Sequence, residues 1–339
     1  MHTEPQLHSP RLIGLDWGTS TLRAYLFGTS GVTLQARTSP FGIMRLPELA
    51  ETSKDNLPSR FEAAFERTCG DWLRQFPSLP VIAAGMIGSA RGWKETPYLN
   101  LPFCLEELGR HLVSLTTATG RSIWIVPGLM KVIPPVNVMR GEETQVLGSL
   151  SSGHSDIQEQ ERLFCLPGTH SKWVYVVRQE VVRFTTFMTG EVYAALCLHT
   201  ILSQTIDPNP RPSFDAEAFE RGVDLAGSIA SEGVLSDIFT SRTLALTGAL
   251  TGEQQADYLS GILIGHEIYA MTVSRAYPNS RLVRQSPITV VGEENLCLRY
   301  ATALKRLGYP DVRFSREAMQ RGLWEVGIQS GLIANDSVA

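Results

Sequence analysis

Residues 12–27 read LIGLDWGTSTLRAYLF, an apolar run, a short Gly/Thr/Ser segment and a second run of alternating pattern. This order predicts a β-hairpin, because two strand-like runs are separated by residues that favour a tight turn. Residues 163–177 read LFCLPGTHSKWVYVV and repeat the order, with Gly-Thr-x-Ser in place of Gly-Thr-Ser. Gly18 and Gly168 lie 150 positions apart in a chain of 339 residues. The repeat therefore indicates an internal duplication, with one hairpin near the start of each half.

Strand-like and helix-like segments alternate along the rest of the chain. Short apolar runs with glycine near their ends, at residues 81–88 and 122–128, are typical of buried strands. Apolar residues recur at helical spacing in four segments, which are residues 61–76, 191–203, 215–226 and 253–276. The alternation predicts an α/β fold with two similar domains that face each other across a cleft.

A polar stretch between the two halves indicates the domain boundary. It reads SSGHSD over residues 151–156 and stays polar up to Glu161, which is typical of a linker. We therefore expect a first domain over residues 10–155 and a second over residues 160–335. The proline-rich residues 207–212 predict a further loop, with Ser213 as the N-cap of the next helix.

Composition excludes several classes of protein. With 43% hydrophobic and 19% charged residues, the chain is not disordered, collagenous or a coiled coil. A formal charge of −4 disfavours a nucleic-acid partner. The polar start and the lack of an apolar run of ~18 residues predict a cytoplasmic protein without membrane contact. The five scattered cysteines contain no C-x-x-C pair, so we expect small buried thiols.

Each Gly/Thr/Ser turn presents backbone N–H groups and hydroxyls that suit phosphate oxygens. The Walker pattern is absent, and one such turn alone is weak evidence, since most of these turns only connect strands. Two turns at matching positions favour a polyphosphate held between the domains. The candidate phosphate-binding residues are Gly18, Thr19, Ser20, Gly168, Thr169, His170, Ser171 and Lys172.

Asp16 stands where the first strand meets its turn, so its carboxylate is expected to face the ligand. A carboxylate beside phosphates can reach Mg²⁺ directly or through water. The alternative is an aspartate that caps its own turn. His170 and Lys172 also have two interpretations, as phosphate donors or as residues on an exposed flank of the second hairpin.

Residues 12–27 and 166–176 resemble the two phosphate motifs of the actin/hexokinase/Hsp70 superfamily of ATP-binding proteins. Five further blocks resemble the 2-dehydro-3-deoxygalactonokinase family, and they stand in order over nearly the whole chain. They read AGMIGS (84–89) with GWK (92–94) and PY (97–98), NVMRGEETQ (137–145), PGTHSKWV (167–174), MTGE (188–191) and LSGILIG (259–265). The number and order of the blocks make the resemblance specific, although each block alone is not.

The resemblance implies two duplicated ribonuclease-H-like (actin-like ATPase) domains around an interdomain cleft. It implies transfer of the γ-phosphoryl group of ATP, with Mg²⁺, to the 6-hydroxyl of 2-dehydro-3-deoxy-galactonate, a small sugar acid of galactonate catabolism. It also places Gly190 among the nucleotide-binding residues. Residues 288–295 resemble the adenosine-binding element, in which Gly292 is the expected contact, although Glu293 and Glu294 replace the usual small residues.

The pair Gly141-Glu142 resembles the Gly-Asp pair that opens a helix in related sugar kinases and supplies the catalytic base. A carboxylate there can accept the proton of a hydroxyl as the bond to phosphorus forms. Adjacent helical residues diverge by ~100° and cannot do the same job. We favour Glu142 as the base, with Glu143 as the alternative or as a first-turn charge favoured by the helix dipole.

An anionic substrate requires a donor for its carboxylate. Arg140 could bind it in a bidentate manner, or it could form a surface salt bridge. The loop after the strand near residue 81 is expected to contact the substrate, as loops at strand ends often do. Its candidate residues are Gly85, Met86, Ser89, Trp93 and Tyr98. Trp93 either shields the sugar acid from water or is a core tryptophan that stabilises the loop.

Other functions stay open. A kinase of the same architecture could act on another sugar acid, such as 2-keto-3-deoxy-gluconate, or on a sugar, because fold does not fix specificity. A sugar-responsive regulator is disfavoured, since about ten residues before the first strand leave no room there for a helix-turn-helix. A nucleotide-switch ATPase with an iron–sulfur cluster is disfavoured by the cysteine spacing. The sequence leaves the oligomeric state open, a homo-oligomer included.

Overall fold

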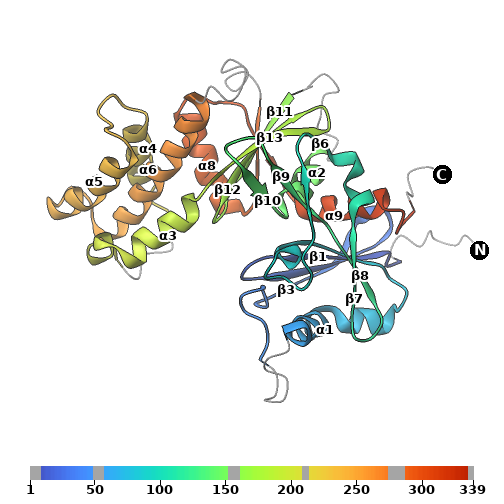
Figure 1. Cartoon of the computed structure of the whole chain (residues 1–339). Coiled ribbons are helices and arrows are strands. Elements are labelled where there is room, and N and C mark those ends of the chain that lie inside the picture. The colour runs from blue at the N-terminus through green and yellow to red at the C-terminus, as the bar shows by residue number, and fades with distance from the viewer. Residues whose placement is uncertain (1–8, 49–56, 152–160, 208–213, 274–286, 335–339) are drawn as a thin grey trace, which may run out of the picture. The chain divides into compact units, whose positions relative to one another are not determined.

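The computed structural model describes residues 9–48, 57–151, 161–207, 214–273 and 287–334 (Figure 1). Its contacts divide the chain into two compact units. The first unit comprises the chain up to residue 160, residues 177–183 and the residues from Arg316 onward; the second comprises residues 161–176 and 184–315. This grouping differs from a single boundary between residues 155 and 160.

The C-terminal helix α9 (Ala318–Gln329) causes one part of that difference, because it packs against strand β1 (Leu12–Trp17) and helix α2 (Glu142–Leu150) of the first unit. Figure 1 shows this helix, in red, near the strands drawn in blue, although the two segments stand at opposite ends of the chain. Three sequence expectations fall wholly or partly outside the described residues, which are the linker after Ser151, the loop over 207–212 with the Ser213 cap, and the helix end at 274–276.

A six-stranded sheet in the order β3-β2-β1-β4-β8-β7 forms the centre of the first unit. Beside β1 its strands are β2 (Leu22–Phe27), β3 (Thr33–Ser39), β4 (Val81–Gly85), β7 (Val113–Thr116) and β8 (Ser122–Ile125). β1 and β2 form the predicted hairpin, in which Asp16 is paired with Arg23. β1 and β4 run parallel, with Trp17 paired with Gly85. All five residues of β4 and five of the six in β1 are buried, as expected for central strands covered on both faces.

Side chains alternate between the two faces of this sheet. Ile13, Leu15 and Trp17 share a core cluster with Phe61 and Phe65 of α1 (Leu57–Gln75). The intervening Gly14 lies on the opposite face, where a Cβ would come within 3.0 Å of the Leu323 side chain of α9. Asp16 has the same parity as Gly14, so its carboxylate lies on the face that α9 covers.

Short elements complete the first unit. A three-stranded sheet has the order β10-β9-β5. The short elements are η1 (Thr29–Gly31), η3 (Met86–Gly88), β5 (Tyr98–Asn100), β6 (Phe103–Cys104), η4 (Leu105–His111), β9 (Gly128–Lys131) and β10 (Asn137–Met139).

The second unit contains most of a six-stranded sheet that has the order β15-β14-β11-β12-β13-β6. Its strands are β11 (Glu161–Leu166), β12 (Ser171–Val177), β13 (Glu180–Phe187), β14 (Ile288–Val291) and β15 (Val312–Ser315), and the start of β13 pairs with β6. The order β13-β12-β11-β14-β15 is the same as β3-β2-β1-β4-β8 of the first unit. β1 pairs in parallel with β4 in the first sheet, and β11 pairs in parallel with β14 at the equivalent place in the second.

Helices complete the second unit. They are α3 (Thr189–His199), η5 (Ile201–Gln204), α4 (Ala216–Ala226), α5 (Val234–Leu246), α6 (Gly252–Val273) and α8 (Glu294–Arg306). The helices predicted from apolar spacing at 61–76 and 215–226 are confirmed, whereas the one predicted at 191–203 ends at His199 and is followed by η5. Asp215, and not Ser213 as predicted, supplies the N-cap of α4. In the described part of the chain, no helix is both long and apolar enough to cross a membrane.

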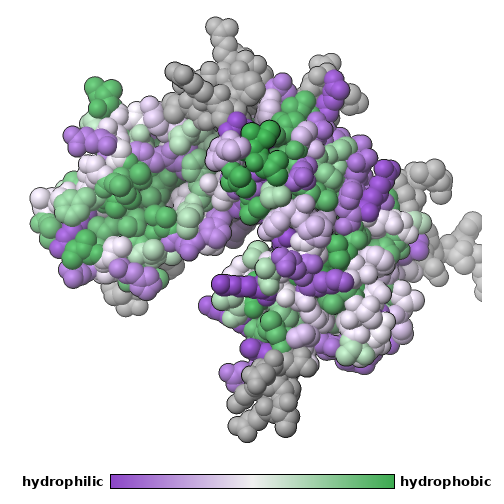
Figure 2. All heavy atoms as spheres, viewed as in Figure 1, coloured by the Kyte–Doolittle hydropathy of each residue, from purple (hydrophilic) through white to green (hydrophobic). Residues whose placement is uncertain are grey.

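Apolar side chains are exposed on α3 and α5. No residue of α3 is buried, and the buried residues of α5 are the polar Asp237 and Ser241. Leu198, Leu235 and Leu246 are 68%, 85% and 65% exposed. Figure 2 shows apolar spheres gathered in the region where Figure 1 draws these helices. Apolar patches of this kind are typical of surfaces that contact another protein.

The expectation of small buried thiols is confirmed for three of the five cysteines, whereas Cys104 and Cys197 are only partly buried. All five are free, and Cys69, Cys165 and Cys297 are buried. Burial raises the pKa of the Cys69 thiol. These three thiols therefore act as small apolar residues of the core.

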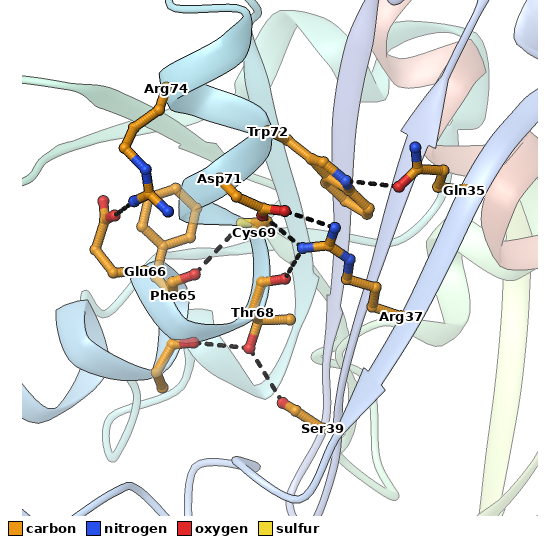
Figure 3. Close-up of polar contacts among 11 residues, drawn as sticks. Gln35, Arg37, Ser39, Phe65, Glu66, Thr68, Cys69, Asp71, Trp72 and Arg74 are labelled. Carbon is orange, nitrogen blue, oxygen red and sulfur yellow. Dashed lines mark hydrogen bonds and ion pairs between the residues drawn. The ribbon is translucent and has the colours of Figure 1, made fainter.

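A polar network anchors α1 to the edge strand β3 (Figure 3). The Arg37 guanidinium donates to both carboxylate oxygens of Asp71, at 2.5 and 2.7 Å, and to the carbonyl oxygen of Thr68 at 3.0 Å. Its Cζ lies 4.2 Å from the ring centre of Trp72, whose Nε1 donates to Gln35 at 2.9 Å. The bidentate pair and the stacking together fix the helix on the sheet.

We expect Asp71→Asn to lower the free energy of unfolding by about 0.5–1 kcal/mol at pH 7, because both side chains are partly exposed and solvent screens the pair. The hydrogen bonds from Arg37 lower the pKa of Asp71 to about 2. The stabilisation is therefore present above the unfolded pKa of ~3.9 and is lost as the pH falls through about 2. Urea titrations at pH 7 and pH 3 measure it, and equal stability of both proteins at pH 7 contradicts the prediction.

Candidate active site

The carboxyl ends of the parallel strands β1 and β4 meet the start of α2. Gly85 and Gly141 have φ angles of +95° and +106°. A Cβ on Gly141 would lie 3.2 Å from the Cα of Gly85, and one on Gly85 would lie 2.9 Å from the carbonyl oxygen of Trp17. Only glycine combines such φ angles with this close approach. Ligands of α/β proteins bind outside the carboxyl ends of parallel strands, so this junction is the first candidate site.

Asp16 lies at this junction and does not cap its own turn. Its side chain is 15% exposed, and its Oδ2 accepts a hydrogen bond from Arg23 Nη1 at 3.0 Å. Burial raises the pKa of Asp16, Arg23 lowers it, and the charge of Glu142 raises it further. Asp16 and Glu142 are therefore close enough for their charges to interact. Arg23 was not among the site residues predicted from the sequence, although its position opposite Asp16 in the hairpin was a signal.

The first turn is held in place from outside the hairpin. The Gly18 N–H donates to the carbonyl oxygen of Thr21, while the carbonyl oxygens of Gly18 and Thr19 accept from Ile43 and Met44, all at 2.9–3.0 Å. Thr19 and Ser20 are exposed, and no acceptor in the described residues uses their N–H groups. The turn therefore has donors available for an anion.

Glu142 and Glu143 have different environments. Glu143 is fully buried, and both its carboxylate oxygens lie 2.8 Å from the backbone nitrogen of Gly141, which donates to them. Burial and the charge of Glu142 raise the pKa of Glu143 to about 8. Glu142 is partly exposed, and its Oε2 accepts from the backbone N–H of Arg140 at 2.9 Å. Glu143 therefore holds the start of the helix, whereas Glu142 can reach a ligand.

Arg140 is a buried cation and forms no surface salt bridge. It is 8% exposed; Nη2 donates to the carbonyl oxygen of Thr96 at 2.9 Å, and Nη1 donates to Oγ1 of Thr96. Its Cζ lies 4.3 Å from the ring centre of Tyr98. Its Nε has no hydrogen-bond partner, and no described carboxylate forms an ion pair with it. Arg140, which precedes Gly141 and α2, therefore contacts Thr96 and Tyr98 of the expected substrate loop. No described carboxylate balances its positive charge.

The other expected substrate residues have local partners. The Trp93 ring is partly buried and packs on the core, 5.9 Å from Phe61 and 6.0 Å from Trp17, while its role in shielding the sugar acid stays a prediction. Met86 packs against the same core, and the Ser89 hydroxyl donates to the carbonyl oxygen of Met86 at 2.8 Å. These three residues give the loop its shape.

The second turn, residues 168–170, also has free donors. No acceptor in the described part of the chain uses the N–H groups of Gly168 or Thr169. Helix α3 begins against this turn, because the Glu191 N–H donates to the carbonyl oxygen of Thr169 at 3.0 Å. A Cβ on Gly190 would lie 2.5 Å from the carbonyl oxygen of Gly168, so no side chain fits there. Gly190 therefore lies beside the turn, as the resemblance implies.

Two side chains expected to bind phosphate turn inward. Ser171 is fully buried and its hydroxyl donates to Glu267 at 2.8 Å. Lys172 is 4% exposed, not on an exposed flank, and its Nζ donates to the carbonyl oxygen of His170 at 3.0 Å. The exposed His170 pairs with Glu191. In this arrangement the hydrogen bonds of the Ser171 hydroxyl and of the Lys172 ammonium stabilise the conformation of the turn.

Gly292 lies near the second turn. A Cβ on it would lie 3.4 Å from the carbonyl oxygen of Pro167, the residue before the turn. Glu293 caps α8 by accepting from the N–H groups of Asn295 and Leu296 at 3.1 and 2.9 Å. Capping of α8 thus explains why an acidic residue follows Gly292.

The family model of 2-keto-3-deoxy-galactonokinase matches residues 16–326. The chain is 34% identical to 2-dehydro-3-deoxygalactonokinase of Escherichia coli K12 over 299 residues, covering 88% of this chain and 90% of that protein. It is 30% identical to a probable 2-dehydro-3-deoxygalactonokinase of Rhizobium meliloti over 321 residues, covering 91% and 96%. A crystal structure assigned to the same activity in Sinorhizobium meliloti superposes with a TM-score of 0.76 at 31% identity, covering 94% and 98%.

Proposed function

The chain belongs to the 2-keto-3-deoxy-galactonokinase family, and from that premise we propose that it transfers the γ-phosphoryl group of ATP to the 6-hydroxyl of 2-dehydro-3-deoxy-galactonate. The observation that supports this chemistry best is the junction of β1, β4 and α2. There the partly exposed carboxylate of Glu142 lies within electrostatic reach of Asp16, whose side chain is 15% exposed. Such an arrangement provides a base beside a position for the phosphates.

Glu142 acts as the general base in this proposal. The substrate's O6 attacks the γ-phosphorus, the bond from that phosphorus to the β–γ bridging oxygen breaks, and ADP leaves. The O6 proton passes to a carboxylate oxygen of Glu142. The backbone N–H of Arg140, which donates to Oε2, holds this carboxylate in position. Glu143 is buried against Gly141 and keeps the helix start in place.

Both turns bind the nucleotide phosphates in this proposal. The first contributes Gly18, Thr19 and Ser20, and the second contributes Gly168 and Thr169 with the start of α3. Gly292 lies near the second turn, which supports its role at the adenosine. The strand order shared by the two sheets supports a duplicated ribonuclease-H-like architecture in which each copy supplies one phosphate turn.

The residues at the junction fit Mg²⁺ as the accompanying ion. In the described residues no group of three or more metal-ligating side chains comes together. Phosphoryl-transfer enzymes bind Mg²⁺ through one or two carboxylates together with substrate phosphates and water, and the Asp16 carboxylate meets this requirement. When bound, the ion would neutralise charge on the transferred phosphoryl group.

Arg140 binds the substrate carboxylate in this proposal. A buried guanidinium that pairs with no carboxylate of the described residues gains most from an anionic ligand. Its stacking on Tyr98 and its hydrogen bonds to Thr96 fix the orientation of its charge.

An assay with γ-labelled ATP tests the function. The purified chain is incubated with 2-dehydro-3-deoxy-galactonate, its gluconate epimer and simple hexoses, and the labelled products are separated. We expect label on the sugar acids, with kcat/KM at least ~100-fold higher than for hexoses, because only an acid can pair with the buried cation. Label found only in free phosphate would favour a nucleotide switch, and preference for a hexose would reassign the substrate.

A further inference from the structure

A buried carboxylate in the second unit receives four side-chain hydrogen bonds. Glu267 on α6 is 3% exposed. It accepts from Ser171 Oγ, Trp173 Nε1 and Tyr300 Oη, each at 2.8 Å, and from Oγ1 of Thr189. No ion pair with a described residue neutralises it. Three of the donors bond to Oε2 and Trp173 bonds to Oε1, so both carboxylate oxygens are engaged.

Three of these donors belong to segments assigned to the nucleotide. Ser171 begins β12 directly after the second turn. Thr189 begins α3 and precedes Gly190, which packs on that turn. Tyr300 lies on α8, the helix that follows Gly292. One carboxylate therefore joins the turn, the start of α3 and the adenosine helix.

Because Ser171, Thr189 and Tyr300 all donate to Glu267, the positions of the second turn, the start of α3 and α8 depend on one another. Removing a buried carboxylate from such a network leaves several buried donors without acceptors, which costs more than the hydrogen bonds themselves gain. The affected donors lie close to the backbone N–H groups of Gly168 and Thr169, which no acceptor in the described residues uses. Loss of Glu267 is thus expected to displace the phosphate donors.

We propose that Glu267 is a positioning residue for ATP, which holds the turn 168–170, the start of α3 and α8 in the arrangement that the nucleotide requires. It touches neither the nucleotide nor the sugar acid. The inference rests on the proposed function, since it presumes that the second turn binds phosphate.

Glu267→Gln tests the proposal, because glutamine keeps the size but presents an NH₂ group to hydroxyl and indole donors. We expect KM for ATP to rise at least ~10-fold while KM for the sugar acid stays within about twofold. The control is Asp237→Asn on α5. Asp237 is also buried; its Oδ2 accepts from Ser231 Oγ at 2.6 Å and lies 2.7 Å from His266 Nε2, and neither partner belongs to a segment assigned to the nucleotide. This control should lower thermal stability and leave KM for ATP unchanged.

Calorimetric titration with Mg²⁺ and a non-hydrolysable ATP analogue separates this inference from the proposed activity. If the unmodified protein binds the analogue and Glu267→Gln binds it at least ~10-fold more weakly, the inference holds, whichever acceptor is phosphorylated. Equal affinity in both proteins overturns it. If the unmodified protein does not bind the analogue, the inference and the proposed function both fail.

A double substitution tests whether Ser171 acts through Glu267. Ser171→Ala alone is expected to weaken binding of the analogue, by less than Glu267→Gln does, since three donors remain. Adding it to Glu267→Gln should cause little further loss, because the two residues form one network. Fully additive losses would contradict the positioning role.

Discussion

Replacing Glu142 by glutamine is expected to lower kcat by roughly 10²–10⁴-fold, the usual contribution of a general base. The amide keeps the acceptor for the Arg140 N–H, which donates to Glu142 at 2.9 Å, so the helix start should stay intact. It cannot accept the proton of the 6-hydroxyl. KM for ATP should change less than about twofold, because the phosphate donors lie on the turns. Steady-state kinetics with both substrates varied measure the effect.

Glu143→Gln is the matched control on the adjacent residue. Burial raises the pKa of Glu143 to about 8, so at pH 7 the carboxyl is largely protonated and glutamine resembles it. We expect kcat within about threefold of the unmodified enzyme. If Glu143→Gln abolishes turnover while Glu142→Gln spares it, the base is Glu143 and the assignment is reversed.

Local patterns predict much of the fold. The hairpin over residues 12–27 and helices α1 and α4 follow from apolar periods of two and 3.6 residues, which are properties of adjacent sequence. The place of α9 could not be predicted in this way. It belongs to the first unit because Leu323 packs near Gly14, and no local signal encodes a contact between opposite ends of a chain.

The residues of the candidate site that stand at strand ends can be predicted from the sequence. The residues whose roles depend on hydrogen-bond partners far away in the chain cannot. Asp16 and Gly85 stand at the ends of apolar runs, and the structure places them at one junction. The sequence predicted that the Ser171 hydroxyl faces the phosphates. In the structure it is buried and donates to Glu267, which lies 96 residues further along the chain. In the sequence Glu267 cannot be told from any other charged residue of a long helix, because its hydrogen-bond donors come from distant segments.

Arg140→Met is expected to raise KM for the sugar acid by about 100-fold, with KM for ATP unchanged within about twofold. Methionine fills similar space without charge, so the variant removes the cation that no described carboxylate balances. Two charge-assisted hydrogen bonds to a carboxylate account for a loss of this size. Arg140→Lys should recover part of it, since lysine keeps the charge and loses the planar fork.

The carboxamide of the substrate distinguishes charge recognition from packing. The unmodified enzyme should discriminate strongly against this neutral analogue, whereas Arg140→Met should use the acid and the amide almost equally, because no buried cation remains to select the anion. An equal loss for both compounds, with discrimination unchanged, would show that Arg140 only supports the loop through Thr96 and Tyr98. The ratio of the two kcat/KM values therefore decides the role, whatever the variant does to stability.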